Sequence, residues 1–236
     1  MSNKVINDLY DYPKMKIVQD EEDFKFSLDS ILLAEFVEPP KRNLKILDMC
    51  TGNAPIPLIL SVKYPNKIIG FEIQEKIYNM AIESININNC KEQIEIINDD
   101  VKNIQNYFPE NNFDIITCNP PYFKVDKNSL LNKNMIKSIA RHEVKIDLEG
   151  IIKIASENLN NKGCLYMVHR PERLDEIIKY CIDNSLAVKK VVLVPTKKDG
   201  MPTMALIKAV KNGNLGVKIS IMQNLNDYKT YQSIFR

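Results

Sequence analysis

The chain has 236 residues, of which 44% are hydrophobic and 26% are charged. This is the composition of a folded globular protein, and it argues against a disordered, collagen-like or low-complexity chain. The formal net charge of +2 is too small to indicate a nucleic-acid ligand by itself.

Acidic and basic residues are unevenly distributed along the chain. Residues 1–40 carry 4 Lys/Arg and 9 Asp/Glu, residues 41–136 carry 11 of each, and residues 137–211 carry 14 Lys/Arg and 9 Asp/Glu. The later half can therefore face an anionic partner, although solvated helix faces explain the same counts equally well.

Five cysteines stand at positions 50, 90, 118, 164 and 181, without a CxxC pair or zinc-ligand spacing. We therefore expect no metal. Cys118 and Cys164 lie in apolar runs, so we interpret them as reduced, buried residues of a cytoplasmic protein. The N-terminus lacks the apolar region of a secretory signal, and no apolar run is long enough to span a membrane, so we expect no membrane association.

Residues 1–25 are polar and acidic, and we expect them to form an irregular arm. Apolar residues at helical spacing predict a helix over 27–37, which Pro39 and Pro40 end. After it, short apolar runs alternate with helical segments. The expected strands are 44–49, 67–72, 94–98, 114–118 and 163–168, and the expected helices are 56–62, 74–88, 148–159 and 172–184. This alternation predicts βαβ units and a parallel sheet.

Two further strands are expected at 188–194 and 204–209. The segment between them is too short for a crossover helix, so they should form an antiparallel hairpin at the end of the sheet. The predicted fold is therefore α/β, with a seven-stranded, mostly parallel sheet and helices on both faces.

Ligands of an open α/β sheet bind at the carboxyl ends of its strands. The first such turn holds Asp48, Thr51, Gly52 and Asn53. Its glycine allows a close approach to a ligand, and its carboxylate favours an amino group over a diphosphate, although an ordinary βα turn has the same residues. Glu72 ends the second strand, 20 residues after Gly52. An acidic residue at this spacing binds ribose hydroxyls in nucleotide sites.

Asp99 and Asp100 follow the third strand. Asp100 can accept a hydrogen bond from an adenine amino group, with the Val101 N–H at a ring nitrogen. A helix N-cap is the alternative, and this segment alone favours it.

The segment Asn119-Pro120-Pro121-Tyr122-Phe123 follows the fourth strand. The prolines fix the backbone and lack N–H donors, while their carbonyls remain acceptors. The side-chain oxygen of Asn119 and the Pro120 carbonyl can both accept from one planar amino group, and Tyr122 or Phe123 can stack on its ring. The pattern predicts a site for a planar amine.

With these residues the chain resembles class I S-adenosylmethionine-dependent methyltransferases of the amino-methylating type, whose (Asp/Asn/Ser)-Pro-Pro-(Tyr/Phe/Trp) tetrad matches Asn119–Tyr122. Over roughly residues 20–210 it resembles the bacterial tRNA1(Val) adenine-37 N6-methyltransferase family. The segments that carry this resemblance are Phe26–Leu33, Leu47–Asn53, Gly70–Glu75, Cys118–Phe123, Ala140–Glu143 and Val168–Pro171. The chain departs from the family's glycine-rich turn at Cys50 and Ala54, where glycine is usual.

The resemblance implies a Rossmann-like class I methyltransferase fold and S-adenosylmethionine as cofactor. It implies an arm with a cofactor-capping helix over 1–40, a catalytic domain over 41–211 and a tail over 212–236. Asp48 and Thr51–Asn53 would hold the amino-acid tail of the cofactor and Glu72 its ribose. The remaining implied cofactor contacts are Asp29, Ser30, Gly52, Ile73, Asp100, Val101 and Asn119.

The implied reaction is N6-methylation of an adenine in tRNA, at A37 of the anticodon loop of a valine tRNA, with Asn119, Pro120, Pro121 and Tyr122 as catalytic residues. The candidate RNA contacts are Phe123, Arg141, His142, Arg170, Arg173, Lys197 and Lys198, with Lys189 and Lys190 as further basic residues. His169 is either a core or a supporting residue. Three alternatives stay open: another planar amine in ribosomal RNA or DNA, a protein glutamine amide, and an RNA-binding module without catalysis. The oligomeric state is also open, with a monomer favoured.

Overall fold

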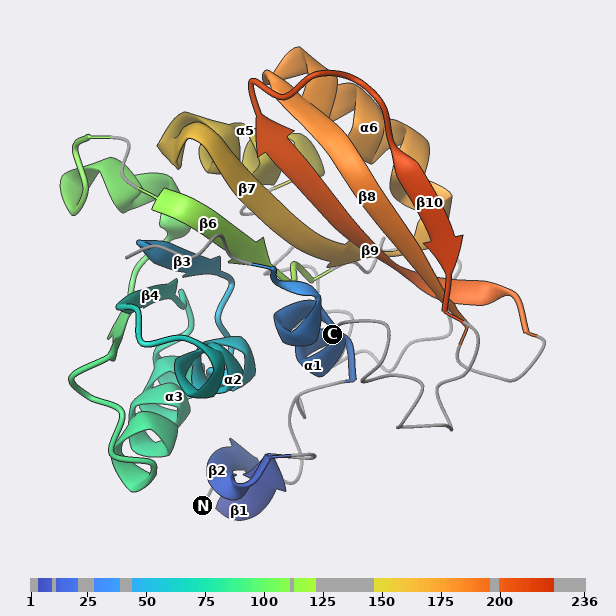
Figure 1. Cartoon of the computed structure of the whole chain (residues 1–236). Coiled ribbons are helices and arrows are strands. Elements are labelled where there is room, and N and C mark those ends of the chain that lie inside the picture. Colours follow the sequence, from blue (N-terminus) through green and yellow to red (C-terminus); the bar gives the residue numbers. More distant parts are fainter. Residues whose placement is uncertain are drawn as a thin grey trace, which may run out of the picture.

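The computed structural model describes residues 4–9, 12–20, 28–38, 44–110, 113–121, 147–195 and 200–222. Its main feature is a sheet with the strand order β10-β8-β9-β7-β6-β3-β4-β5 (Figure 1). The strands are β3 (Ile46–Met49), β4 (Ile68–Phe71), β5 (Ile94–Ile97), β6 (Phe113–Cys118), β7 (Leu159–His169), β8 (Leu186–Pro195), β9 (Pro202–Lys211) and β10 (Lys218–Ile221).

The sheet reverses its direction of growth between β3 and β6. From β3 the chain moves outward through β4 to β5, then returns to the other side of β3 as β6, and all these pairs are parallel. The strand β7 continues parallel to β6, whereas β9 lies antiparallel between β7 and β8. The predicted parallel sheet with an antiparallel hairpin is confirmed, and the reversal marks the edge where a ligand site is expected.

Helices cover both faces of the sheet (Figure 1). The helices α1 (Leu28–Phe36), α2 (Pro55–Lys63) and α3 (Glu75–Ile87) pack on one face, and α5 (Leu148–Asn158) and α6 (Leu174–Asp183) pack on the other. Successive strand residues alternate between the two cores, as Ile46 and Leu47 do. Two short 3₁₀ helices, η1 (Val101–Asn106) and η2 (Pro171–Arg173), follow β5 and β7.

The expectation of an irregular arm over 1–25 is wrong for much of that segment. The strands β1 (Lys4–Leu9) and β2 (Tyr12–Asp20) form an antiparallel hairpin beside α3 (Figure 1). Side chains of α3 and its C-cap hold β2. The Asn88 side chain accepts from the Lys16 N–H and donates to the Lys16 carbonyl. Ser84 Oγ accepts from the Val18 N–H at 2.9 Å. These contacts join residues far apart in sequence, so local patterning does not reveal them.

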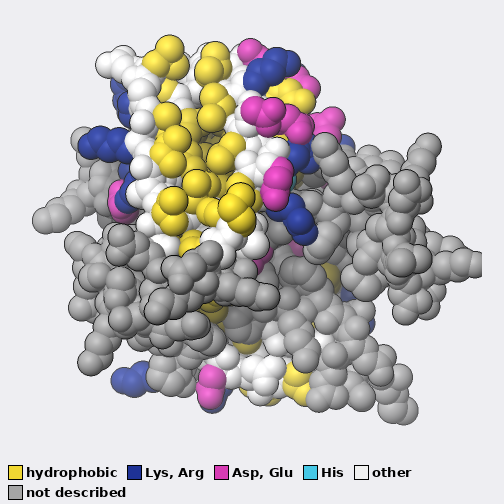
Figure 2. Space-filling model, turned by 90° about the vertical axis from the view of Figure 1, so that its right-hand side faces the viewer, with side chains coloured by type: hydrophobic (Ala, Val, Ile, Leu, Met, Phe, Trp, Pro, Cys, Tyr) yellow, Lys and Arg dark blue, Asp and Glu magenta, His cyan; other side chains and the backbone are white. Residues whose placement is uncertain are grey.

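The expected number of seven strands is one too few, because β10 in the C-terminal segment pairs in parallel with β8 and gives the sheet eight strands among the described residues. The β8–β9 hairpin is therefore not the end of the sheet, as was expected; β10 is. All four residues of β10 are exposed, and the next residue, Met222, is buried. Figure 2 looks at this edge of the molecule and shows hydrophobic side chains gathered on the surface. The exposed apolar residues of this segment are Leu215, Val217, Ile219 and Ile221. Backbone pairing, rather than burial of its side chains, therefore holds β10 on the sheet.

The cysteines and the helices bear on two expectations from the sequence, one about burial and one about membrane spans. All five cysteines are free, and Cys118 is buried as predicted, but Cys164 is only partly buried. Among the helices of the described residues, none has the length and apolar character required to cross a membrane.

Candidate functional site

The turn after β3 has a left-handed backbone at three positions. Cys50, Gly52 and Ala54 have φ angles of 59°, 60° and 73°. These are the positions where related turns carry glycine, so the two substitutions keep the backbone geometry at some cost in strain. A Cβ placed at Gly52 would meet no heavy atom within 4 Å among the described residues. The turn thus leaves open space beside its backbone.

Asp48 lies at the centre of this edge and is fully buried. Thr117 Oγ1 on β6 donates to Asp48 Oδ1 at 2.6 Å, while no donor among the described residues reaches Asp48 Oδ2. Burial raises the pKa of Asp48 to about 7, the Glu72 carboxylate adds to the rise, and the hydroxyls of Thr117 and Thr51 oppose it. A buried carboxylate oxygen without a donor is costly, and a cationic ligand would satisfy it.

Thr117 was not among the residues predicted from the sequence. It faces Asp48 because the two residues are register partners in the β3–β6 pair. Only the strand pairing reveals this contact, since 69 positions separate the two residues in sequence.

Glu72 connects two neighbouring loops at the same edge. Its Oε2 accepts from the Gly52 N–H at 2.9 Å, and its Oε1 accepts from the Gln74 N–H, just before α3, at 2.8 Å. The side chain of Asn98 donates to the Glu72 carbonyl at 2.8 Å. Each carboxylate oxygen can accept more than one hydrogen bond, so Glu72 can also accept hydrogen bonds from the hydroxyls of a ligand.

The loop after β5 carries the two aspartates. Asp100 is the N-cap of η1, and its Oδ1 accepts from the Lys102 N–H at 3.1 Å, so the interpretation as a cap is confirmed. The contact of Asp100 with an adenine amino group stays a prediction. Asp99 accepts hydrogen bonds from Asn103 and from the Tyr107 hydroxyl, at 2.8 and 2.9 Å. These bonds, led by that from Asn103, hold the pKa of Asp99 below its ordinary value. The ring of Tyr107 in turn packs edge-on against Phe71.

Asn119 ends β6 and contacts the N-terminal helix. Its Nδ2 donates to Ser30 Oγ on α1 at 2.9 Å, and Ser30 is buried. Pro120 is buried, while Pro121 is exposed. The sequence places Ser30 at the cofactor pocket, and the structure places it against the side chain of Asn119. Tyr122, Phe123, Arg141, His142, Lys197 and Lys198 lie outside the described residues.

Three other predicted cofactor residues are buried or partly buried. The Asn53 amide donates to the Val18 carbonyl at 2.8 Å, so this side chain anchors β2 to the turn. Ile73 and Asp29 are partly buried, after β4 and next to Ser30 respectively.

The described basic candidates differ in their surroundings. Arg170 is exposed directly after β7, whereas Arg173 forms an ion pair with Glu176, with Nε–Oε1 at 2.6 Å. Lys190 pairs with Glu38 at 2.8 Å in the middle of β8, away from the carboxyl end of that strand. Lys189, beside it, donates to the Asn214 carbonyl at 3.1 Å. Of these four candidates for RNA contacts, Arg170 is the one that is exposed, and it lies at the carboxyl end of β7.

His169 is a buried residue at the end of β7. Its Nδ1 accepts from the Arg170 N–H at 2.9 Å. Burial and, after it, the charge of Arg173 lower the pKa of His169 to about 4, so the ring is neutral at pH 7. The structure agrees with the interpretation of His169 as a core or supporting residue.

Comparison with protein families and known proteins agrees with this geometry. Residues 25–191 match the family described as methyltransferase small domain. The tRNA1(Val) (adenine(37)-N6)-methyltransferase of Bacteroides fragilis is 26% identical over 198 residues, which cover 84% of this chain and 82% of the relative. The release factor glutamine methyltransferase of Thermodesulfovibrio yellowstonii is 32% identical over 130 residues, which cover 52% of this chain and 45% of the relative.

Solved structures share the fold at low sequence identity. A predicted O-methyltransferase, protein Atu636 from Agrobacterium tumefaciens, matches with a TM-score of 0.66 and 19% identity over 89% of this chain and 97% of its own. The TYW2 protein of M. jannaschii, in complex with AdoMet, matches with a TM-score of 0.59 and 12% identity over 89% of this chain and 86% of its own. The predicted class I methyltransferase fold is therefore confirmed.

Proposed function

Since the chain belongs to the methyltransferase small domain family, we propose that it transfers a methyl group from S-adenosylmethionine to the N6 amine of an adenine in tRNA. The observation that carries the proposal is the position of Asn119 and Pro120 at the carboxyl end of β6, directly beside the strand that bears Asp48. The name of the Bacteroides fragilis relative, which covers most of both chains, supports tRNA as the substrate. We further assign the target to A37 in the anticodon loop of a valine tRNA, in the cytoplasm.

The residues at this edge fit S-adenosylmethionine. Asp48 Oδ2 is a buried acceptor that lacks a donor among the described residues, which suits the ammonium group of the molecule. Gly52, four positions later in the chain, has open space beside its backbone, which suits the close approach of the amino-acid tail. The Glu72 carboxylate suits the ribose hydroxyls, and Asp100 with Val101 suits the adenine edge. When bound, this cofactor supplies an electrophilic methyl group on a sulfonium.

The acceptor side of the reaction belongs to Asn119 and Pro120. The lone pair of adenine N6 is delocalised into the ring, which makes the amine a poor nucleophile. Hydrogen bonds from N6 to Asn119 Oδ1 and to the Pro120 carbonyl hold the amine and localise its lone pair. Positioning of this kind can supply much of a rate enhancement. The amine then loses its proton to water.

The base must leave its stack to enter the pocket, and an unpaired adenine in a loop lowers that cost. Tyr122 would stack on the extruded base, an interaction worth about 1–3 kcal/mol in single-strand readers. Arg170, exposed after β7, would contact the RNA backbone together with Arg141, His142, Lys197 and Lys198.

A glutamine amide is the second candidate substrate, because the release factor glutamine methyltransferase is similar to about half of this chain. A glutamine side chain presents the same planar amine, and the contacts of Asn119 and Pro120 would serve both. The tRNA methyltransferase relative covers more of the chain, 84% against 52%, and therefore favours adenine.

The test supplies labelled S-adenosylmethionine to the purified protein with three acceptors: tRNA from a strain that lacks the gene, ribosomal RNA, and a release factor. Asn119→Ala is the test variant. Asn161→Ala, at an exposed position near the opposite end of β7, is the matched control. The proposal expects label in tRNA with the wild type and the control, and none with Asn119→Ala. Label in the release factor or ribosomal RNA alone, or full activity of Asn119→Ala, would overturn it.

A further inference from the structure

We infer that Ser30 is a positioning residue for methyl transfer, which acts by holding the side-chain amide of Asn119; this inference rests on the proposed function. The two residues come from distant parts of the chain, 89 positions apart, and meet at the carboxyl end of β6. Ser30 Oγ accepts from Asn119 Nδ2 at 2.9 Å. Only 5% of the surface of Ser30 is exposed, so water competes little for this bond.

The direction of this bond matters for the chemistry. A carboxamide carries a donor at one end and an acceptor at the other, and the two ends have nearly the same shape. With Nδ2 committed to Ser30, Oδ1 remains for the amine of the substrate. Rotation of the amide by half a turn would present an N–H group to another N–H group. The Ser30 contact therefore holds the side chain in the orientation seen in the structure, with Nδ2 at Ser30.

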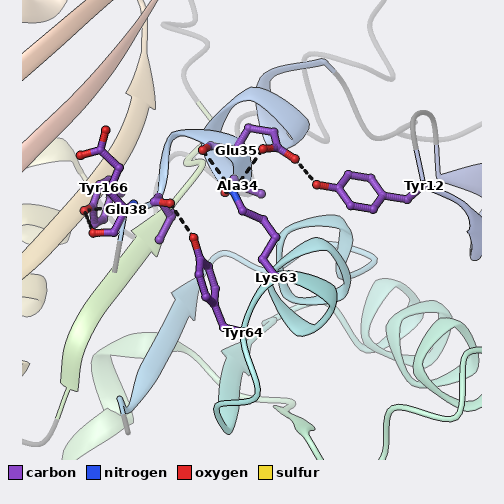
Figure 3. A network of polar contacts seen from close by, with 8 residues as sticks. Tyr12, Ala34, Glu35, Glu38, Lys63, Tyr64 and Tyr166 are labelled. Atoms are coloured by element: carbon purple, nitrogen blue, oxygen red, sulfur yellow. Dashed lines mark hydrogen bonds and ion pairs between the residues drawn. The ribbon is translucent and has the colours of Figure 1, made fainter. Parts of the chain in front are cut away.

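The helix that carries Ser30 is itself held firmly. Lys63 Nζ donates to the carbonyls of Ala34 and Glu35 at the end of α1, at 2.9 and 3.1 Å (Figure 3). The Tyr64 hydroxyl donates to the Val37 carbonyl at 2.9 Å. These bonds fix the position of α1 relative to α2. A residue that must hold another to within a fraction of an ångström benefits from such a rigid support.

This role differs from the cofactor contact expected for Ser30 from the sequence. A cofactor contact would change the affinity for S-adenosylmethionine when it is removed. A positioning residue for the acceptor amine changes the rate of the chemical step and leaves that affinity unchanged.

The experiment compares Ser30→Ala and Ser30→Thr with the wild type. Equilibrium dialysis gives the Kd for S-adenosylmethionine, and single-turnover reactions at saturating tRNA give the rate of transfer. Because a lost hydrogen bond between neutral groups changes an equilibrium by up to about tenfold, Ser30→Ala should slow transfer by about that factor with an unchanged Kd. Ser30→Thr, which keeps the hydroxyl, should restore the rate. The control is Ser61→Ala, a helical serine whose Oγ donates to the Leu58 carbonyl on α2, and it should behave as the wild type.

An independent measurement follows the Asn119 amide directly by NMR, with its side-chain NH₂ signals assigned by their loss in Asn119→Ala. Ser30→Ala should shift these signals, and Ser30→Thr should return them. An unchanged transfer rate in Ser30→Ala, a Kd raised by the same factor as the rate falls, or unshifted amide signals would overturn the inference. If the wild type does not methylate tRNA, the proposed function fails, and the NMR signals still decide whether Ser30 holds Asn119.

Discussion

Glu72 accepts a hydrogen bond from the backbone N–H of Gly52, with 2.9 Å between Oε2 and N. Through this bond the loop after β4 holds the turn after β3. Because its other oxygen accepts from the Gln74 N–H, one carboxylate sets the geometry of two loops that border the cofactor site.

Glu72→Gln should lower both stability and cofactor affinity. An amide has one acceptor atom, so one of the two backbone N–H groups would face an NH₂ group, and an unsatisfied buried donor costs about 1–3 kcal/mol. Urea unfolding measures the stability, and equilibrium dialysis measures the Kd for S-adenosylmethionine. The exposed Glu75→Gln is the control and should change neither. A Glu72→Gln protein with wild-type stability and affinity would contradict this role.

Asp48 should make cofactor binding dependent on pH. Its pKa is about 7 without ligand, and the ammonium group of the cofactor pairs only with the ionised carboxylate. Affinity should therefore weaken as the pH falls below about 7, by up to about tenfold per pH unit. In Asp48→Asn the affinity should be low and should lose this dependence. Binding titrations between pH 5.5 and 8.5 test it, and a flat profile for the wild type would count against it.

The same carboxylate should affect the stability of the ligand-free protein. Its folded pKa lies above the ordinary value of 3.8, so the folded state binds the proton more tightly than the unfolded state. The contribution of Asp48 to stability is thus present below about pH 4 and is lost as the pH rises toward 7. Asp48→Asn should remove this loss and should be more stable than the wild type at pH 8. Urea unfolding at pH 5 and pH 8 measures the difference, and a less stable Asn variant at pH 8 would contradict the burial of an unpaired charge.

Lys63→Met should destabilise the protein by removing the donor to the end of α1. The change leaves the carbonyls of Ala34 and Glu35 without the Lys63 ammonium, at a cost of about 1–3 kcal/mol. The exposed ion pair of Lys67 with Glu95 supplies the control, and Lys67→Met should change the free energy of unfolding by less than about 1 kcal/mol. Urea unfolding tests both, and equal effects would contradict a special role for Lys63.

Gly70→Ala should disturb the turn after β3, because Gly70 on the neighbouring strand β4 contacts Thr51 of that turn. A Cβ at Gly70 would lie 2.5 Å from both Thr51 Oγ1 and Ile96 Cδ1, so these side chains must move. Overpacking of this kind costs about 1–3 kcal/mol. The double variant Gly70→Ala with Thr51→Ala should recover part of the lost stability. Thermal unfolding measures both proteins, and a fully stable single variant would show that this contact is not tight.

The sequence allowed the sheet to be predicted because its strands are short apolar runs followed by turn residues. The order of β3, β4 and β6 placed Asp48, Glu72 and Asn119 at one edge, and the structure agrees. The β1–β2 hairpin was not predicted because Ser84 and Asn88 on α3 and its C-cap hold it, and such contacts are not visible in a local pattern.

The hydrogen-bond partners of Asp48 and Asn119 within the site could not be predicted from the sequence either. Thr117 contacts Asp48 through strand pairing. Ser30 contacts Asn119 because α1 packs on α2 and β7 and brings Ser30 to the carboxyl end of β6. The resemblance placed Ser30 among the cofactor contacts at this edge of the sheet. Only the fold identifies Nδ2 of Asn119 as the atom that Ser30 contacts.

The proposed methylation is tested most directly with a purified valine tRNA that carries an unmodified A37, the wild-type protein and S-adenosylmethionine. Mass spectrometry of the anticodon-loop fragment locates any added methyl group. We predict N6-methyladenosine at position 37 with the wild type, and an unmodified fragment with Asn119→Ala. A fragment that stays unmodified with the wild type, or a methyl group on another nucleotide, would contradict it.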